Sequence, residues 1–128
     1  MQRLIAIGFQ KVGVWKLING NLALEISSPT TQGNVLYAFI HHDHVLYIGK
    51  TTQTFTKRMM GYKNPGPTQY TNIKNNANIK ALLQQTECID IYALEDMGLM
   101  RYGEFQINLA AGLEDNLIKV FQPEWNCR

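Results

Sequence analysis

Two runs of alternating apolar and polar residues, VWKLI and NLALEI, lie on either side of the pair Asn19-Gly20. An Asn-Gly pair is favoured in the two-residue turn of a β-hairpin, because both turn residues must adopt positive φ angles. Alternation with a period of two is typical of strands that bury one face. The sequence therefore predicts a β-hairpin over residues 14–26.

The other segments predict a mixture of strands and helices. The spacing of apolar residues distinguishes them, since period two indicates a strand and a period near 3.6 indicates a helix. Thr52 or Thr54 is expected to cap the first helix and Thr71 the second. The predicted elements are a buried strand at the N-terminus, a connector at 27–33, a hairpin at 34–49, helices at 52–62, 71–86 and 108–121, a loop at 63–70, a strand at 87–94, and a loop with some helix at 95–105.

This order of elements predicts an α+β fold, with a small, mainly antiparallel central sheet flanked by helices. A chain of 128 residues is long enough for one modest core. We expect residues 1–33 to form an N-terminal hairpin extension packed on the core, and residues 34–128 to form a single compact unit.

Composition excludes several classes of protein. The hydrophobic content of 45% and charged content of 17% are ordinary for a globular protein. No segment approaches the roughly 18 apolar residues of a membrane span, and the apolar stretch at the start is too short for a signal peptide. Cys88 and Cys127 lack the spacing of a zinc site, and free thiols in a reducing cytoplasm are favoured over a disulfide. We therefore expect a cytoplasmic protein.

Several polar residues lie at the ends of the predicted elements. Lys50 follows the triplet Tyr47-Ile48-Gly49, and Tyr37 lies at a similar place in the preceding strand. Arg58 and Tyr62 are four residues apart and share one face of the predicted helix. Glu114 and Asn126 belong to the last helix and to the ending Pro-Glu-Trp-Asn.

Together, these motifs resemble the GIY-YIG endonuclease family. Tyr47-Ile48-Gly49 matches the second half of the family name, whereas Val35-Leu36-Tyr37 keeps the tyrosine of the first half and lacks its glycine. Arg58 and Tyr62 match the family's Arg-x-x-x-Tyr. Glu114 matches its metal-binding glutamate, and residues 123–126 match its Pro-x-Trp-Asn ending. The likeness covers residues 35–126 and is nearest to the restriction-type and stand-alone bacterial or phage members.

The resemblance implies a metal-dependent DNA endonuclease that hydrolyses phosphodiester bonds with one Mg²⁺ or Mn²⁺, held by Glu114. It implies that Arg58 binds the scissile phosphate and Tyr62 orients it, while Asn126 ties the C-terminal tail to the site. Tyr37 or Tyr47 is the general base, and Lys50 is expected to lower its pKa. We favour Tyr37, although the sequence does not decide. The alternative is a non-catalytic nucleic-acid-binding module that keeps the fold, which the missing glycine supports.

The distribution of charge supports a polyanionic ligand independently. The formal net charge is only +2, but residues 44–86 contain no Asp or Glu. A cationic segment without acids favours binding to phosphates, so DNA is the expected partner of a monomer or homodimer. The segment HHDH at 41–44 favours a polar turn over a metal site. The asparagines at 72, 75, 76 and 78 fit DNA contacts and a solvated helix face equally well. The expected DNA-binding residues are Lys50, Lys57, Arg58, Lys63, Lys74 and Lys80.

Overall fold

A computed structural model describes residues 1–28, 34–96, 98 and 100–126. Its centre is a five-stranded sheet with the strand order β2-β1-β5-β3-β4. Every pairing in this sheet is antiparallel. The expected α+β class with a mainly antiparallel sheet is therefore confirmed. The strands are β1 (Gln10–Ile18), β2 (Asn21–Ile26), β3 (Val35–His41), β4 (His44–Thr51) and β5 (Ile89–Glu95).

Both predicted hairpins are present. Asn19 and Gly20 have φ angles of 53° and 80°, and His42 and Asp43 have 49° and 65°, so both turns use the left-handed backbone that tight hairpins require. The N-terminal hairpin was expected to pack on the core as an extension. It instead pairs through β1 with β5 and so forms two strands of the same sheet.

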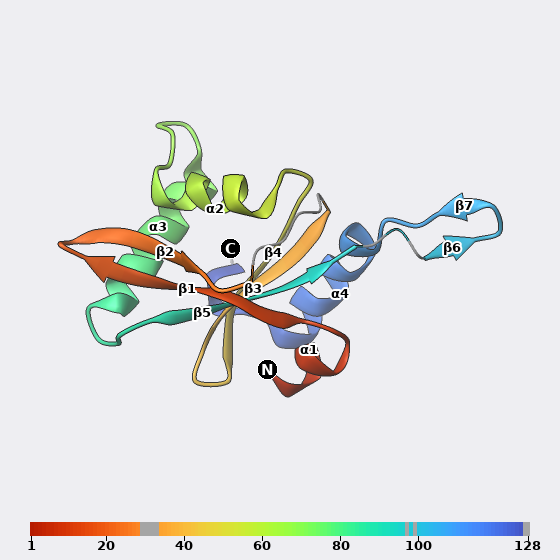
Figure 1. The fold of residues 1–128 in the computed structure, drawn as a ribbon, viewed down its shortest axis with the longest axis horizontal. Coiled ribbons are helices and arrows are strands. Elements are labelled where there is room, and N and C mark those ends of the chain that lie inside the picture. The colour runs from red at the N-terminus through yellow and green to blue at the C-terminus, as the bar shows by residue number, and fades with distance from the viewer. Residues whose placement is uncertain (29–33, 97, 99, 127–128) are drawn as a thin grey trace.

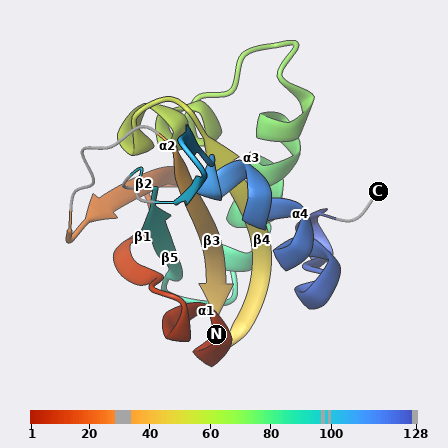
Figure 2. The same ribbon diagram turned by 90° about the vertical axis from the view of Figure 1, so that its right-hand side faces the viewer.

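Helices cover both faces of the sheet (Figure 1). Two helices, α2 (Phe55–Lys63) and α3 (Tyr70–Leu83), pack on one face over a core that includes Trp15 and Phe39. On the other face, α1 (Gln2–Ala6) and α4 (Leu109–Phe121) pack over the second core. Figure 2 shows that α4 lies beside β4, the edge strand on which the candidate site is built.

Three local expectations were wrong. Residues 2–6 form a short helix rather than a strand, with Leu4 as their buried residue. Gln69 rather than Thr71 precedes the first residue of α3. Residues 101–106 form a small separate hairpin, β6 (Arg101–Tyr102) and β7 (Phe105–Gln106), where a loop with some helix was expected.

The other elements lie close to their predicted positions. Thr54 caps α2 by accepting a hydrogen bond from the backbone N–H of Lys57. Helix α4 ends at Phe121, and Gln122 adopts a left-handed φ of 45° just before Pro123. A 3₁₀ turn (Glu124–Asn126) then returns the chain to β4.

Among the described residues, no helix combines the length and the apolar character needed to cross a membrane. Most of the connector at 27–33, and Cys127, lie outside the described residues.

Candidate active site

The end of the edge strand β4 brings together residues from four parts of the chain. The backbone N–H of Ile48 donates to Asn126 Oδ1, and Asn126 Nδ2 donates to the Ile48 carbonyl, both at 2.8 Å. One side-chain amide thus satisfies both polar groups of an edge residue. The next residue, Gly49, lies against the phenol of Tyr37, where a Cβ would come within 2.6 Å of both Cζ and Oη. Gly49 is therefore required by the position of the Tyr37 ring.

Lys50 follows at once and forms an ion pair with Glu114 of α4, with 3.5 Å between Nζ and Oε1. The carboxylate side chain is 20% exposed and that of Lys50 is 45% exposed. The pair therefore remains open to solvent, and both groups can reach a ligand. Consecutive strand residues point to opposite faces. Gly49 therefore contacts Tyr37 on one face of β4, and the next residue, Lys50, contacts Glu114 on the other.

Three of the predicted residues form a continuous hydrogen-bonded network on the other side of β4. The hydroxyl groups of Tyr37 and Tyr62 are 2.5 Å apart, and Arg58 Nη2 donates to Tyr62 Oη at 2.8 Å. The guanidinium also lies over the Tyr62 ring, 4.3 Å from its centroid. Spacing of four residues on α2 places Arg58 and Tyr62 on the same face. Tyr47 packs against Tyr37 and Tyr62, with its ring centroid 6.3 Å from each of theirs.

Sequence reasoning missed the residue that holds the arginine in place. Arg58 Nη1 donates to Asn72 Oδ1 at 2.8 Å, and Asn72 Nδ2 donates to Gln69 Oε1 at 3.1 Å. Asn72 is buried on α3, and the same glutamine oxygen accepts from the backbone N–H of Gly66. Because two of its nitrogens are already fixed, the arginine fork has a defined orientation.

The signal for this residue was available in the sequence. The buried face of α3 is formed by Asn72, Asn75, Ile79 and Leu83, at helical spacing. Two apolar residues of the same helix, Ile73 and Ala77, are exposed instead. Asn72 is bonded to Arg58, and Asn75 is buried with no hydrogen-bond partner among the described residues, so neither is available for base contacts. Asn76 donates to the carbonyl of Tyr62 at 2.8 Å.

The structure gives Lys50 a charged partner other than the one expected from its proposed role toward Tyr37. Burial raises the pKa of Tyr37 far above its ordinary value, and the nearby Tyr47 raises it further. The cation that lowers the pKa of Tyr37 is Arg58, whereas Lys50 is paired with Glu114. Burial also raises the pKa of Tyr62. Both buried hydroxyls therefore remain protonated at neutral pH, which makes Tyr37 a poor general base.

These buried tyrosines predict a loss of stability in alkaline solution. In the unfolded chain each would titrate near pH 10. Since the folded pKa is raised, the stabilisation is complete below pH ~10 and falls above it, by up to about 1.4 kcal/mol per pH unit for each tyrosine. Urea unfolding from pH 8 to 11 should show this slope, and the double variant Tyr37→Phe/Tyr62→Phe should flatten it. Tyr70→Phe, at a site 76% exposed, is the control and should leave the slope unchanged.

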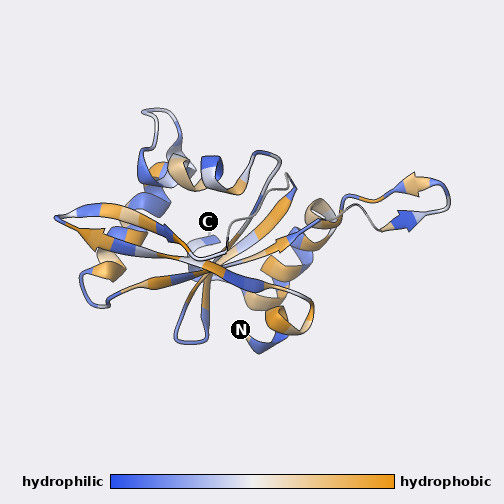
Figure 3. Ribbon diagram, in the orientation of Figure 1, coloured by the Kyte–Doolittle hydropathy of each residue, from blue (hydrophilic) through white to orange (hydrophobic). Residues whose placement is uncertain are grey.

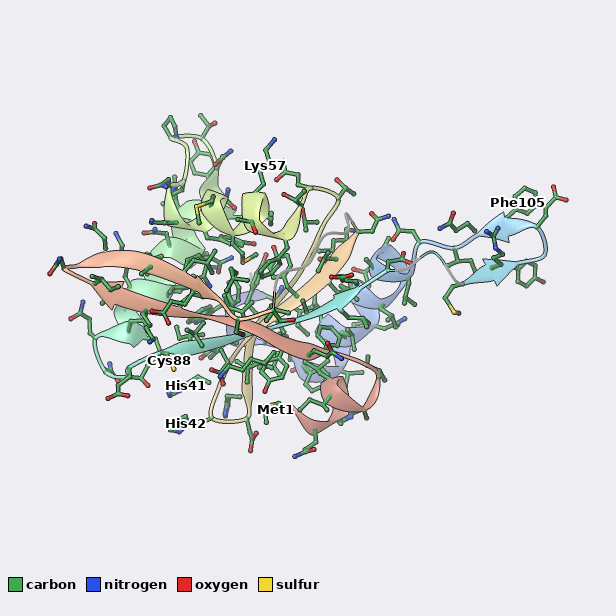
Figure 4. All side chains as sticks on the ribbon, in the orientation of Figure 1. Met1, His41, His42, Lys57, Cys88 and Phe105 are labelled. Atoms are coloured by element: carbon green, nitrogen blue, oxygen red, sulfur yellow. The ribbon has the colours of Figure 1, made fainter. Side chains whose placement is uncertain are left out.

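The predicted DNA-binding cations do not gather at one point. Lys50 and Arg58 belong to the site, and Lys57 extends outward from α2 (Figure 4). Lys63 and Lys80 instead line a cavity of about 380 Å³ beside Asn21 at the tip of the N-terminal hairpin. Lys74 is exposed on α3. The cations thus extend from the end of β4 along α2 and α3.

The histidines at 41–44 lie at the turn between β3 and β4, as expected for a polar turn. His41 bonds Thr86 Oγ1 at 3.0 Å, and the rings of His41 and His42 stack with centroids 4.1 Å apart. Within the described part of the chain, no group of three or more His, Cys, Asp or Glu residues is placed to hold a metal ion. Cys88 is a free thiol.

The whole fold is similar to solved structures of two other proteins. One is a mutant of bacteriophage T4 EndoII, with a TM-score of 0.78, 27% sequence identity, and coverage of 99% of this chain and 98% of that one. The other is restriction endonuclease HPY188I in complex with product DNA, with a TM-score of 0.58, 16% identity, and coverage of 98% and 80%. No protein-family model matches the chain, and no curated protein matches its sequence. The first likeness includes the N-terminal hairpin, because it covers nearly the full length of both chains.

Proposed function

We propose that the chain is a metal-dependent DNA endonuclease of the GIY-YIG type. One observation carries this proposal: Ile48, Gly49 and Lys50 of β4 contact Asn126, Tyr37 and Glu114 in turn. The ion pair of Lys50 and Glu114 thereby lies next to the residue that contacts the buried network of Tyr37, Tyr62 and Arg58. The similarity of the fold to a restriction endonuclease solved with product DNA supports DNA as the substrate.

Arg58 would bind the scissile phosphate. Its guanidinium has five N–H donors, and the bonds to Asn72 and Tyr62 occupy one on each of two nitrogens. The remaining donors are available to an anion, since the residue is only partly buried. A fork already fixed by protein contacts binds phosphate with little further loss of side-chain entropy. Lysine at this position would lose both the fork and the stacking on Tyr62.

Glu114 would hold the metal ion. Mg²⁺ and Mn²⁺ prefer oxygen ligands, and Mg²⁺ is commonly held by one or two carboxylates together with substrate phosphate and water. The partly exposed carboxylate of Glu114 therefore fits such an ion. When bound, the ion would stabilise the negative charge that develops on the phosphate. Lys50 positions the carboxylate and adds positive charge where the substrate must bind.

Tyr47 is better placed than Tyr37 to accept the proton of the attacking water. The Tyr37 hydroxyl is enclosed by Gly49 and Tyr62. Tyr47 is 9% exposed, whereas Tyr37 has no exposed surface. In the proposed reaction the water oxygen bonds to phosphorus while the phenolate form of this tyrosine takes its proton. The bond from phosphorus to the leaving sugar oxygen breaks, and solvent water protonates that oxygen.

Supercoiled plasmid DNA tests the proposal directly. We expect nicked product with Mg²⁺ or Mn²⁺ and none with EDTA. Without the metal ion, Lys50 and Arg58 alone would stabilise the negative charge that develops on the phosphate too weakly for cleavage. A mobility-shift assay without metal measures binding separately. Binding of DNA without cleavage in either metal would contradict the proposal and indicate the non-catalytic module instead.

A further inference from the structure

The loop between α2 and α3, residues 64–69, is linked to the candidate site by hydrogen bonds. It extends away from the sheet, and its residues are hydrophilic or close to neutral in hydropathy (Figures 1 and 3). Gln69, the last of them, is exposed to solvent. Its side-chain oxygen nevertheless accepts two hydrogen bonds, from the backbone N–H of Gly66 at 2.8 Å and from Asn72 Nδ2 at 3.1 Å. The oxygen of Asn72 accepts from Arg58 in turn. We call Gln69 and Asn72 the amide relay.

The two ends of the amide relay fix the direction of every hydrogen bond in it. A backbone N–H can only donate, so Gly66 requires the side-chain oxygen of Gln69 rather than the nitrogen. That oxygen can only accept, so Asn72 must turn its nitrogen toward Gln69 and its oxygen toward Arg58. A guanidinium has donors and no acceptor, and this orientation of Asn72 is the one that it needs. Each amide is therefore held in one of its two possible orientations.

Gln69 is itself held by its main chain. Its backbone N–H donates to the carbonyl of Gly66 at 3.1 Å, so the side chain and the main chain of Gln69 bond the same residue. Its carbonyl accepts from the backbone N–H of Ile73 at 2.9 Å, in the first turn of α3. The amide relay therefore starts from a defined position in the backbone, although its first member is exposed.

The amide relay meets Arg58 beside a glycine of α2. A Cβ on Gly61 would lie 3.2 Å from Asn72 Nδ2 and 3.4 Å from Arg58 Nη1, which is tighter than ordinary van der Waals contact. The pair of Arg58 and Asn72 thus occupies the space that a side chain at position 61 would fill. Asn72 is 7% exposed, so water has little access to it. A hydrogen bond away from water is electrostatically stronger than one in water.

We propose that Gln69 is a positioning residue for Arg58 and acts through Asn72. Its effect on cleavage rests on the proposed function, in which Arg58 binds the scissile phosphate. Water in place of the Gln69 side chain could donate or accept, so it would not impose the direction that Arg58 needs. A guanidinium with more freedom to turn stabilises the growing negative charge on the phosphate less well. An exposed loop residue thereby sets the geometry of a group at the reacting centre.

Two variants of Gln69 test this role in steady-state cleavage of a DNA duplex. Gln69→Met has no side-chain oxygen, and we expect kcat to fall by about tenfold with a change in KM below about twofold, because the phosphate gains charge in the transition state. Gln69→Glu keeps an acceptor for both hydrogen bonds. Its kcat should stay within about twofold, whereas KM should rise because the added negative charge repels DNA. Circular dichroism should show both variants folded, since Gln69 is exposed.

Nuclear magnetic resonance of isotope-labelled protein measures the freedom of Arg58 without any cleavage. The quantity is the rate at which the guanidinium rotates about its C–N bonds, and the signals that disappear in Arg58→Lys identify the residue. We expect slow rotation in the unmodified chain and in Gln69→Glu. Rotation in Gln69→Met should be faster by about fivefold, as for the loss of about one hydrogen bond.

Gln84→Met is the matched control, because Gln84 is also exposed and lies at the opposite end of α3. It should change neither kcat nor the rotation of Arg58. An unchanged kcat or an unchanged rotation rate in Gln69→Met would overturn the proposal, and so would equal effects in Gln69→Glu. If no protein cleaves DNA, the proposed function fails, whereas faster rotation in Gln69→Met alone still supports the amide relay.

Discussion

Replacing Glu114 with glutamine should reduce plasmid cleavage by about 10³-fold or more, because the amide keeps the shape of the side chain but cannot hold a divalent cation against water. The fold should be unaffected. Glu114 lies on a partly exposed helix face, and its ion pair with Lys50 is open to solvent, where such pairs contribute about 0–1 kcal/mol at most. The measurement is the initial rate of nicking at saturating Mg²⁺.

Asp115→Asn provides the matched control for this variant. Asp115 is the next residue of α4 and is exposed, so Asp115→Asn removes one negative charge, as Glu114→Gln does, but leaves the contact between Lys50 and Glu114 intact. Its rate should stay close to that of the unmodified chain. DNA binding without metal should be retained by both variants. Undiminished nicking by Glu114→Gln would remove this residue from the metal site and, with it, the proposed one-metal mechanism.

The second large effect concerns the two tyrosines of the β3–β4 hairpin. Tyr47→Phe should lower the cleavage rate by about 10²-fold or more, since it removes the hydroxyl proposed to accept the proton of water. Tyr37→Phe should cost about tenfold, because it removes a bond to Tyr62 while Arg58 keeps its own bonds to Tyr62 and Asn72.

The pH profile separates the two roles. Because a general base acts only when it is unprotonated, loss of the base should flatten the dependence of the cleavage rate on pH. We therefore expect a flattened profile in Tyr47→Phe and an unchanged profile in Tyr37→Phe. If Tyr37→Phe instead abolishes cleavage and flattens the profile while Tyr47→Phe remains active, the buried hydroxyl is the base despite its raised pKa. Lys50 is not expected to influence this pH dependence through Tyr37, since its partner is Glu114.

Local signals in the sequence were sufficient for most of the fold. The Asn19-Gly20 pair and the alternation around it are enough to predict a hairpin, because both turn angles and strand faces are decided within a few residues. The N-terminal helix was missed because a short apolar run such as LIAI fits a strand and a single helical turn equally well. Its helical state depends on the burial of Leu4 against the sheet, which is a tertiary effect.

The residues of the candidate site can be proposed from the sequence, but their contacts cannot. The structure places Tyr37 and Arg58 against Tyr62, yet nothing local indicates that Tyr37 points into the core while Lys50 turns to Glu114. These directions depend on strand register and on the helix that covers each face. Asn72 was overlooked because its role depends on Arg58, fourteen residues earlier in the chain.

The amide of Asn126 has a consequence for solubility as well as for the site. An edge strand presents free N–H and C=O groups that can pair with another chain, and such edges are common starting points of aggregation. Asn126 occupies both polar groups of Ile48, as a neighbouring strand would, and so interrupts the free edge of β4 at its most apolar stretch. One side chain thus shields the sheet from unwanted partners beside the place where a substrate must approach.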